Sequence, residues 1–162
     1  MGKQPLSDIR VLDVSSILAA PVTATLLGDF GAEVIKVERP GSGDFTRRQA
    51  TSQGGRSLQW VQEGRNKKSI TLDLHTDVGQ RVLKRLIPLC DVMVTNYRPS
   101  TLLRWGLAPE AVMAQNPRLI ALYVTGFGLT GPYRDRGAFD RVASAFAGLT
   151  YVTGEADGPP DP

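Results

Sequence analysis

The sequence has little of the side-chain chemistry on which several enzyme classes depend. Its 162 residues include one cysteine, Cys90, and one histidine, His75. A single cysteine permits no internal disulfide, which is typical of a reducing compartment. Cys90 lies in LIPLCDVMV at the entry of a predicted strand, so we interpret it as a buried thiol. A metal site or a catalytic triad within this chain would have to use His75, which disfavours both.

Long apolar runs are also absent. No segment approaches the ~20 consecutive apolar residues that a membrane span requires, and the start MGKQPLSDIR lacks the charged-then-apolar layout of a signal peptide. With 41% hydrophobic and 22% charged residues, the composition fits a globular domain. We therefore expect an intracellular protein of the cytoplasm, or of an organellar matrix if a targeting segment has been removed, with no membrane partner.

The positive charge is small and dispersed. The net charge is +3, and the basic residues are interleaved with acids instead of forming a run. Nucleic acid is therefore not an expected partner. One local group, formed by Lys36, Arg39, Arg47 and Arg48, suits a compact polyanion, although solvated surface charge is the more common role for any one of these residues.

Apolar strand patterns alternate with helical patterns along the chain. The expected strands are 9–14, 32–38, 69–74, 91–96 and 119–128, and the expected helices are 21–31, 57–64, 78–89, 100–106 and 109–116. Thr76 and Asp77 can cap the helix that follows them, whereas about 40–56 reads as a loop. Such alternation implies right-handed crossovers. We predict an α/β fold, with a Rossmann-like, mostly parallel sheet and helices on both faces, as a single domain over residues 1–162.

In an open parallel sheet, ligands bind beyond the carboxyl ends of the strands. The first such turn, DVSSILAAPV, contains no G-x-G-x-x-G, so a site for NAD or FAD is not encoded. Arg39 follows the second predicted strand, where an adenosine ribose commonly lies. A planar guanidinium there suits a ribose phosphate through two parallel hydrogen bonds. A 2′-phosphate would indicate NADP, and a 3′-phosphate would indicate coenzyme A (CoA).

Five stretches cover nearly the whole chain. They are APVTATLLGDFGAEVIKVERPGSGD, NKKSITLDL, CDVMVTNYRPSTLLRWGL, NPRLIALYVTGFGLTGPYRDRGAFD and AFAGLTYVTGEADGPP. In this order they resemble the N-terminal part of the class III CoA-transferases, which include formyl-CoA transferase, carnitine-related CoA-transferases and α-methylacyl-CoA racemase. The resemblance implies that CoA moves between an acyl-CoA and a free carboxylic acid, without a metal. It also implies an interlocked homodimer for the full-length protein.

The resemblance further implies a CoA site. In the family, the arginine after the glutamate of the second strand contacts the adenine nucleotide, which matches the role argued above for Arg39. The positions that line the CoA site in the family are Ile17, Arg39, Leu72, Leu74, Asn96, Tyr97 and Arg104. From the residues alone, Leu72 and Leu74 would read equally well as core.

The family chemistry requires a nucleophilic aspartate, which attacks the thioester to give a mixed anhydride and then an aspartyl-CoA thioester. In the family this aspartate follows the TG..DG.P stretch, so we expect it beyond Pro162 and assign no catalytic residue in this chain. The 162-residue chain alone is then expected to be inactive, lacking the catalytic segment and the second domain. Asp140 corresponds to an auxiliary acid of the family, or it caps the helix that it begins.

Two departures bear on the reaction. Racemase-like members carry a histidine immediately before the acid at Asp140, as one half of a two-base proton shuttle. Phe139 occupies that position here, which favours a transferase over a racemase. Leu18 replaces a glutamine of formyl-CoA transferase-like members, so a dicarboxylic or branched substrate stays as open as formyl-CoA. A non-catalytic fragment that binds CoA or only assembles with another chain is the remaining alternative.

Overall fold

A computed structural model of the chain describes residues 3–49, 51–155 and 157–159. Residues 160–162, at the end of the predicted domain, lie outside this range. The chain divides into two compact units, Met1–Val124 and Thr125–Pro162. The first unit contains the sheet, and the second contains two short helices.

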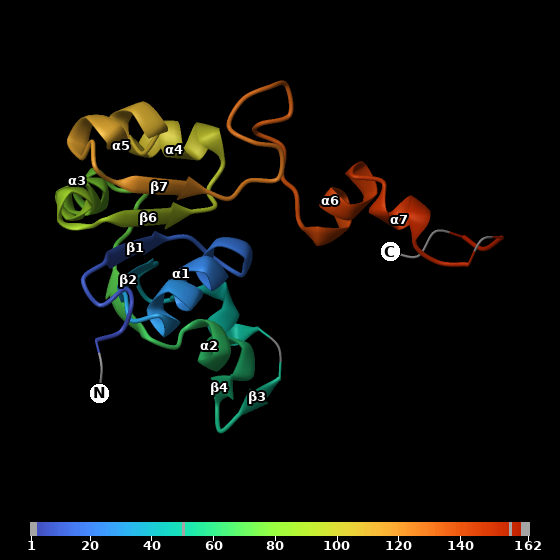
Figure 1. The fold of residues 1–162 in the computed structure, drawn as a ribbon, viewed down its shortest axis with the longest axis horizontal. Coiled ribbons are helices and arrows are strands. Elements are labelled where there is room, and N and C mark those ends of the chain that lie inside the picture. The colour runs from blue at the N-terminus through green and yellow to red at the C-terminus, as the bar shows by residue number, and fades with distance from the viewer. Residues whose placement is uncertain (1–2, 50, 156, 160–162) are drawn as a thin grey trace. The chain divides into compact units, whose positions relative to one another are not determined.

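The first unit is built on a parallel sheet of five strands in the order β5-β2-β1-β6-β7 (Figure 1). The strands are β1 (Arg10–Val14), β2 (Glu33–Glu38), β5 (Lys67–Thr71), β6 (Val92–Thr95) and β7 (Ile120–Tyr123). All four neighbouring pairs are parallel. The predicted α/β fold with a Rossmann-like sheet is therefore confirmed.

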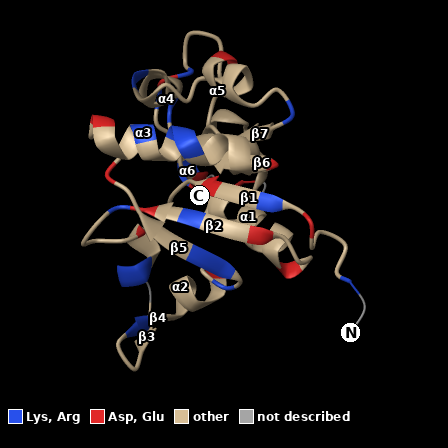
Figure 2. Cartoon of the chain, turned by 90° about the vertical axis from the view of Figure 1, so that its left-hand side faces the viewer, with Lys and Arg blue, Asp and Glu red and all other residues tan. Residues whose placement is uncertain are grey.

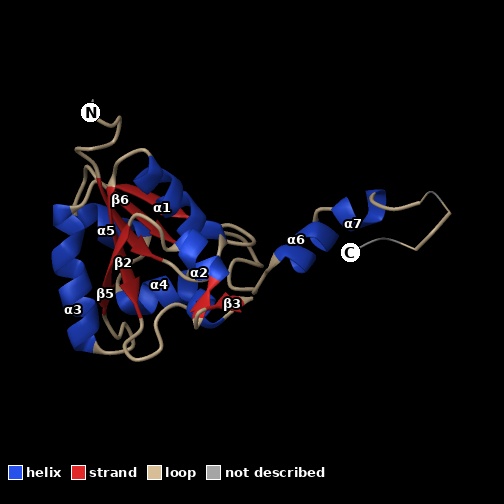
Figure 3. Ribbon diagram, turned by 90° about the horizontal axis from the view of Figure 1, so that it is seen from below, coloured by secondary structure: helices blue, strands red, loops and turns tan. Residues whose placement is uncertain are grey.

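Helices cover both faces of this sheet. They are α1 (Ala19–Asp29), α2 (Leu58–Glu63), α3 (Asp77–Leu86), α4 (Pro99–Trp105) and α5 (Pro109–Gln115), with the 3₁₀ turn η2 (Ile87–Leu89) after α3. Figure 3 shows α1 and α3 on opposite sides of the strands. Side chains alternate between the faces: Val11 and Val34 pack against α1, whereas Leu12 and Val37 belong to the cluster that contains α3, α4 and α5.

Several element boundaries differ from the prediction. The strand expected over 69–74 is β5 at Lys67–Thr71, and the strand expected over 119–128 ends at Tyr123. The segment interpreted as a loop contains the 3₁₀ helix η1 (Phe45–Arg48) and a small antiparallel hairpin, β3 (Ser52–Gln53) and β4 (Arg56–Ser57). These short elements depend on side-chain bonds such as the Asp44 cap of η1, which periodicity does not reveal.

Two local predictions for this unit are confirmed. The Thr76 hydroxyl accepts a hydrogen bond of 3.1 Å from the Gly79 N–H and so caps α3. Cys90 is buried with 4% of its surface exposed, and burial raises the pKa of its thiol to about 11.

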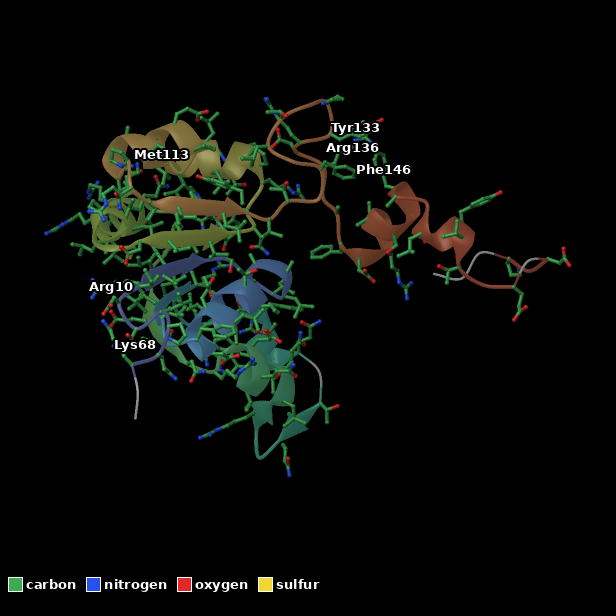
Figure 4. All side chains as sticks on the ribbon, in the orientation of Figure 1. Arg10, Lys68, Met113, Tyr133, Arg136 and Phe146 are labelled. Carbon is green, nitrogen blue, oxygen red and sulfur yellow. The ribbon has the colours of Figure 1, made fainter. Side chains whose placement is uncertain are left out.

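The second unit contains α6 (Asp140–Phe146) and α7 (Leu149–Val152). Phe127, Tyr133 and Phe146 pack their rings edge to face, with centroids 5.1 to 5.9 Å apart, and the Arg136 guanidinium lies 4.1 Å from the centre of the Tyr133 ring (Figure 4). Phe139 is the N-cap residue of α6, and Asp140 lies inside the first turn without a capping hydrogen bond. The interpretation of Asp140 as a helix cap is therefore wrong.

Candidate functional site

A pocket lies where β2 and β5 end. We refer to it as the Arg39 pocket; it is lined by residues 37–39 and 72–75 together with Tyr97 and Trp105. The first set leaves β2, the second follows β5, and the two aromatic residues come from the segment after β6 and from α4. Because the strands are parallel, their carboxyl ends meet at one edge and bring these segments together.

The predicted site residues separate into two groups. Arg39, Leu72, Leu74 and Tyr97 line the Arg39 pocket. The other predicted residues are Ile17, Asn96 and Arg104, and they are not among its lining residues. Asp73, His75 and Trp105 line the pocket but were not among the predicted site residues. His75 directly follows the predicted strand 69–74, so the strand-exit rule could have included it.

The Arg39 guanidinium is available to a ligand. It is exposed, and within the described part of the chain it makes no hydrogen bond and no ion pair. The contrast with Arg47 is direct: Arg47 donates two hydrogen bonds of 2.6 and 2.7 Å to Glu38 and lies 3.7 Å from the centre of the Trp60 ring. An unpaired guanidinium in a pocket can bind a phosphate group with both of its parallel N–H donors.

An aromatic group forms one wall of the pocket. The Trp105 ring is 7% exposed and meets Tyr97 edge to face with centroids 4.7 Å apart. On its other side it meets His75 at 5.7 Å. Asp73 fixes the histidine, because its Oδ1 accepts from the His75 N–H at 3.0 Å and lies 3.1 Å from Nδ1. A flat heterocycle can pack against such a wall.

The turn after β1, residues 15–18, forms a second part of the site and is here named the β1 turn. The helices after β1 and β6 lie on opposite faces of the sheet, so the ends of these two strands mark the topological switch point. Asn96, after β6, bridges the two strand ends: its Oδ1 accepts from the Ser16 N–H at 3.0 Å and its Nδ2 donates to the Ser16 carbonyl at 2.8 Å. Ile17 follows with a φ of 68°, which β-branched residues rarely adopt.

Ile17 thus belongs to the β1 turn and Asn96 binds this turn through Ser16, whereas Arg104 belongs to neither part of the site. Arg104 is exposed on α4 and donates a hydrogen bond of 3.3 Å to the Thr101 hydroxyl. Tyr97 connects the two parts, because it lines the Arg39 pocket and directly follows Asn96, which binds the β1 turn. Burial, together with the negative charge of Asp44 and Asp13, raises the pKa of Tyr97.

Beneath both parts lies a buried charge cluster formed by Asp13, Lys36, Asp44 and Lys67. The Lys36 Nζ lies 3.2 Å from Asp44 Oδ2 and 3.6 Å from Asp13 Oδ2. The Lys67 Nζ lies 2.9 Å from the same Asp13 oxygen. Each side chain is at most 2% exposed, so each of these charges depends on its partners. Figure 2 shows the basic residues of β2 and β5 on neighbouring strands.

The group of basic residues around Arg39 therefore has a different character from the one its sequence indicated. Lys36 is 1% exposed and paired inside the protein, and Arg47 is bound to Glu38. The interpretation of Lys36 as a polyanion-binding or solvated cation is wrong, because buried acids take up its charge. Arg47 is exposed, as its sequence context indicated, but its charge is paired with the buried Glu38. The Arg48 guanidinium donates to the Ser42 carbonyl. Arg39 differs, because among the described residues its side chain has no hydrogen-bonding partner, although its carbonyl accepts from the Gly43 N–H at 2.9 Å.

Glu38 organises the loop that follows Arg39. Its carboxylate accepts from Arg47, from the Ser69 hydroxyl at 2.5 Å and from the Asp44 N–H at 2.8 Å. Burial favours the neutral acid, but the bonds from Arg47, Ser69 and Asp44 outweigh it and lower the pKa of Glu38 to about 2. Glu38 is therefore an ionised carboxylate that holds the loop in place, and the guanidinium that faces the pocket is that of Arg39.

Comparison with known proteins shows the family to which the chain belongs. The model of CoA-transferase family III matches residues 6–161, so the chain belongs to this family and the predicted resemblance is confirmed. A crystal structure of a CAIB/BAIF family protein from Brucella suis matches 99% of this chain and 44% of that chain, with a TM-score of 0.89 and 36% sequence identity.

Curated relatives carry specific names. The chain is 51% identical over 157 residues to the succinyl-CoA–L-malate CoA-transferase beta subunit of Chloroflexus aurantiacus, covering 96% of this chain. It is 50% identical over 158 residues to the succinyl-CoA–D-citramalate CoA-transferase of the same organism, covering 97% of this chain. The chain spans 39% of the length of each of these two relatives.

Proposed function

We propose that the chain supplies the CoA-binding part of an enzyme that transfers CoA from an acyl-CoA to a free carboxylic acid. The observation that carries this proposal is the unpaired Arg39 guanidinium beside the aromatic wall of Tyr97 and Trp105. In the proposal Arg39 binds the 3′-phosphate of CoA, and the adenine lies against the wall. Leu72 and Leu74 supply apolar contacts to the nucleotide.

The remainder of CoA is proposed to pass Tyr97 and reach the β1 turn. Ile17 and Asn96 then act at the thioester side of the ligand, with Asn96 acting through Ser16 because its amide is already bound there. Arg104 was also predicted to line the site; in this proposal it serves only the outer rim, because it is exposed on α4.

The proposed substrates are succinyl-CoA or a similar acyl-CoA and a dicarboxylic acid. The relatives that support this choice are named for succinyl-CoA with L-malate and with D-citramalate. The proposed step is attack of an aspartate on the thioester carbonyl, which expels the CoA thiolate and leaves an acyl anhydride on the enzyme. Glu38 is not proposed as this nucleophile, since Arg47, Ser69 and Asp44 already bind its carboxylate.

Calorimetry with two ligands tests the proposed nucleotide site. Arg39→Ala should weaken CoA binding by about 1.5 to 3 kcal/mol, the range for a hydrogen bond to a charged group. Binding of dephospho-CoA, which lacks the 3′-phosphate, should change little. Arg118→Ala is the matched control, because Arg118 is exposed before β7 at the opposite edge of the sheet. Equal losses for both ligands would contradict the assignment of Arg39.

We also infer that the protein works as an oligomer. The second unit leaves large apolar side chains exposed, including Phe139 at 73%, Phe146 at 65% and Tyr151 at 84%. Apolar surface of this kind commonly marks contacts with other protein surface, and one relative is named as a beta subunit. Sedimentation velocity over a range of concentrations should show association. A compact monomer at high concentration would contradict this inference.

A further inference from the structure

We propose that Lys36 is a positioning residue that holds the β1 turn and the loop after β2 in a fixed relative arrangement. This inference rests on the proposed function, because the β1 turn and the Arg39 pocket are the two parts of the proposed CoA site. Lys36 touches no ligand in this proposal. It acts through two backbone segments: the β1 turn, which belongs to the proposed site, and the loop that begins directly after Arg39.

The contacts of the Lys36 ammonium support this role. Its Nζ donates a hydrogen bond of 3.0 Å to the Ser15 carbonyl, which belongs to the β1 turn. The same atom lies 3.2 Å from Asp44 Oδ2, in the loop after β2. Asp13, at 3.6 Å, balances the remaining charge. An ammonium group has three N–H donors, and three oxygens surround this one. Lys36 as a whole is 1% exposed to solvent.

On the loop side, Asp44 transmits the contact. Its second oxygen, Oδ1, accepts from the Thr46 N–H at 2.9 Å and from the Thr46 hydroxyl at 2.7 Å, so it caps η1. The Asp44 N–H donates 2.8 Å to Glu38. The loop is therefore fixed at Glu38 and at Asp44, on both sides of the segment that begins with Arg39.

On the turn side, the surrounding side chains hold a conformation that the sequence does not favour. The Ser15 hydroxyl donates to Asp13, and Asn96 binds both backbone polar groups of Ser16. Ile17 then adopts a φ of 68°. A β-branched residue stays in this region only where its surroundings determine it. The Lys36 bond to Ser15 is one of these determinants.

Holding the β1 turn and the loop after β2 in place before a ligand arrives should raise the affinity for that ligand. A ligand that reaches both segments binds more tightly when neither must be ordered on binding. A ligand that contacts the Arg39 pocket alone gains nothing from the link to the β1 turn. Removing Lys36 should therefore weaken binding of a ligand that reaches both segments more than binding of a ligand that reaches the Arg39 pocket alone. A lower stability by itself would not produce this difference, because binding is measured on folded protein.

Lys67 offers a matched control. Its ammonium is equally buried and binds the same Asp13 oxygen at 2.9 Å, but its other acceptor is the Pro21 carbonyl of α1 at 2.7 Å. In the part of the chain that the structure describes, its ammonium bonds neither Ser15 nor Asp44. Lys67→Met therefore removes a buried ammonium without cutting the connection between the β1 turn and the loop.

The experiment compares Lys36→Met and Lys67→Met with two ligands, CoA and adenosine 3′,5′-bisphosphate, by calorimetry at a temperature at which each variant is folded. Lys36→Met should weaken CoA binding about tenfold and change binding of the bisphosphate less than about twofold. Lys67→Met should change both ligands alike. Equal effects of Lys36→Met on both ligands would overturn the proposal.

Hydrogen exchange without ligand separates this inference from the proposed function. Lys36→Met should lower amide protection in residues 15–18 and 40–48, whereas Lys67→Met should spare residues 40–48. If the wild-type chain bound neither ligand but the two variants showed this exchange pattern, the proposed function would fail and the role of Lys36 would stand. Uniform loss of protection in Lys36→Met would overturn that role. If Lys36→Met does not fold, Asp44→Asn serves instead, because it removes the ion pair and keeps an oxygen for Thr46.

Discussion

The side-chain amide of Asn96 binds both backbone polar groups of Ser16, accepting from its N–H at 3.0 Å and donating to its carbonyl at 2.8 Å. These bonds join the ends of β6 and β1 across the switch point of the sheet. A residue predicted to line the CoA site thus has its amide oxygen and one of its two amide N–H donors engaged within the protein. Its contribution to binding is expected to be indirect.

Asn96→Ala should lower the free energy of unfolding by about 1 to 3 kcal/mol, since it removes two hydrogen bonds that are partly buried. Urea unfolding followed by circular dichroism measures the change. Gln115→Ala is a suitable control, because its amide makes one bond of 2.9 Å to Ala111 within its own helix. If both variants lost the same stability, the two bonds of Asn96 would stabilise the fold no more than a bond within one helix, which would contradict the prediction.

The strands next to β1 show what periodicity predicts well. Predicted strands 32–38 and 91–96 contain β2 and β6 completely, because segments rich in β-branched residues indicate strands. Prediction was weaker where backbone pairing, not side-chain pattern, sets the end of a strand. The apolar run continues past Tyr123, but residues 125–128 belong to the second unit.

The site was predictable to the extent that it follows strand ends. Arg39, Leu72, Leu74 and Tyr97 line one pocket because parallel strands bring their exits together. The burial of Lys36 was not predictable, because a lysine in a strand usually faces solvent. Only the fold shows that Asp13 and Asp44 reach its ammonium, and these partners are distant in sequence.

Acid should weaken the fold through Glu38. The pKa of this carboxyl is about 2 in the folded chain, against 4.5 for its ordinary value, so the unfolded chain binds a proton more readily. The resulting stability is fully present above about pH 4.5 and is lost as the pH falls towards 2. For a side chain that is 1% exposed the loss should approach about 3 kcal/mol.

Glu38→Gln isolates this contribution. The free energy of unfolding of wild type, measured with urea between pH 5 and pH 2.5, should fall more steeply than that of the variant. Other acids, including Glu33, titrate in both proteins and cancel in the difference. Parallel pH profiles for the two proteins would show that Glu38 is not a linked group.

The thiol of Cys90 can be used to measure how often the fold opens and exposes it to solvent. Burial raises the pKa of Cys90 to about 11, so little thiolate is present at pH 8. Its reaction with Ellman's reagent should be at least about a hundredfold slower than that of N-acetylcysteine, and denaturant should abolish the difference. Native chain that reacted as fast as the free thiol would contradict the buried position of Cys90.

Tryptophan fluorescence should report ligand entry into the Arg39 pocket. The chain has two tryptophans, Trp60 and Trp105, and only Trp105 lines the pocket. In Trp60→Phe, emission comes from a ring that is 7% exposed, and saturating CoA should change its intensity because an adenine packs against the wall formed with Tyr97. In Trp105→Phe, emission from Trp60 beneath the Arg47 guanidinium should stay constant. A CoA-dependent change of the same size in both variants would place the nucleotide outside the pocket.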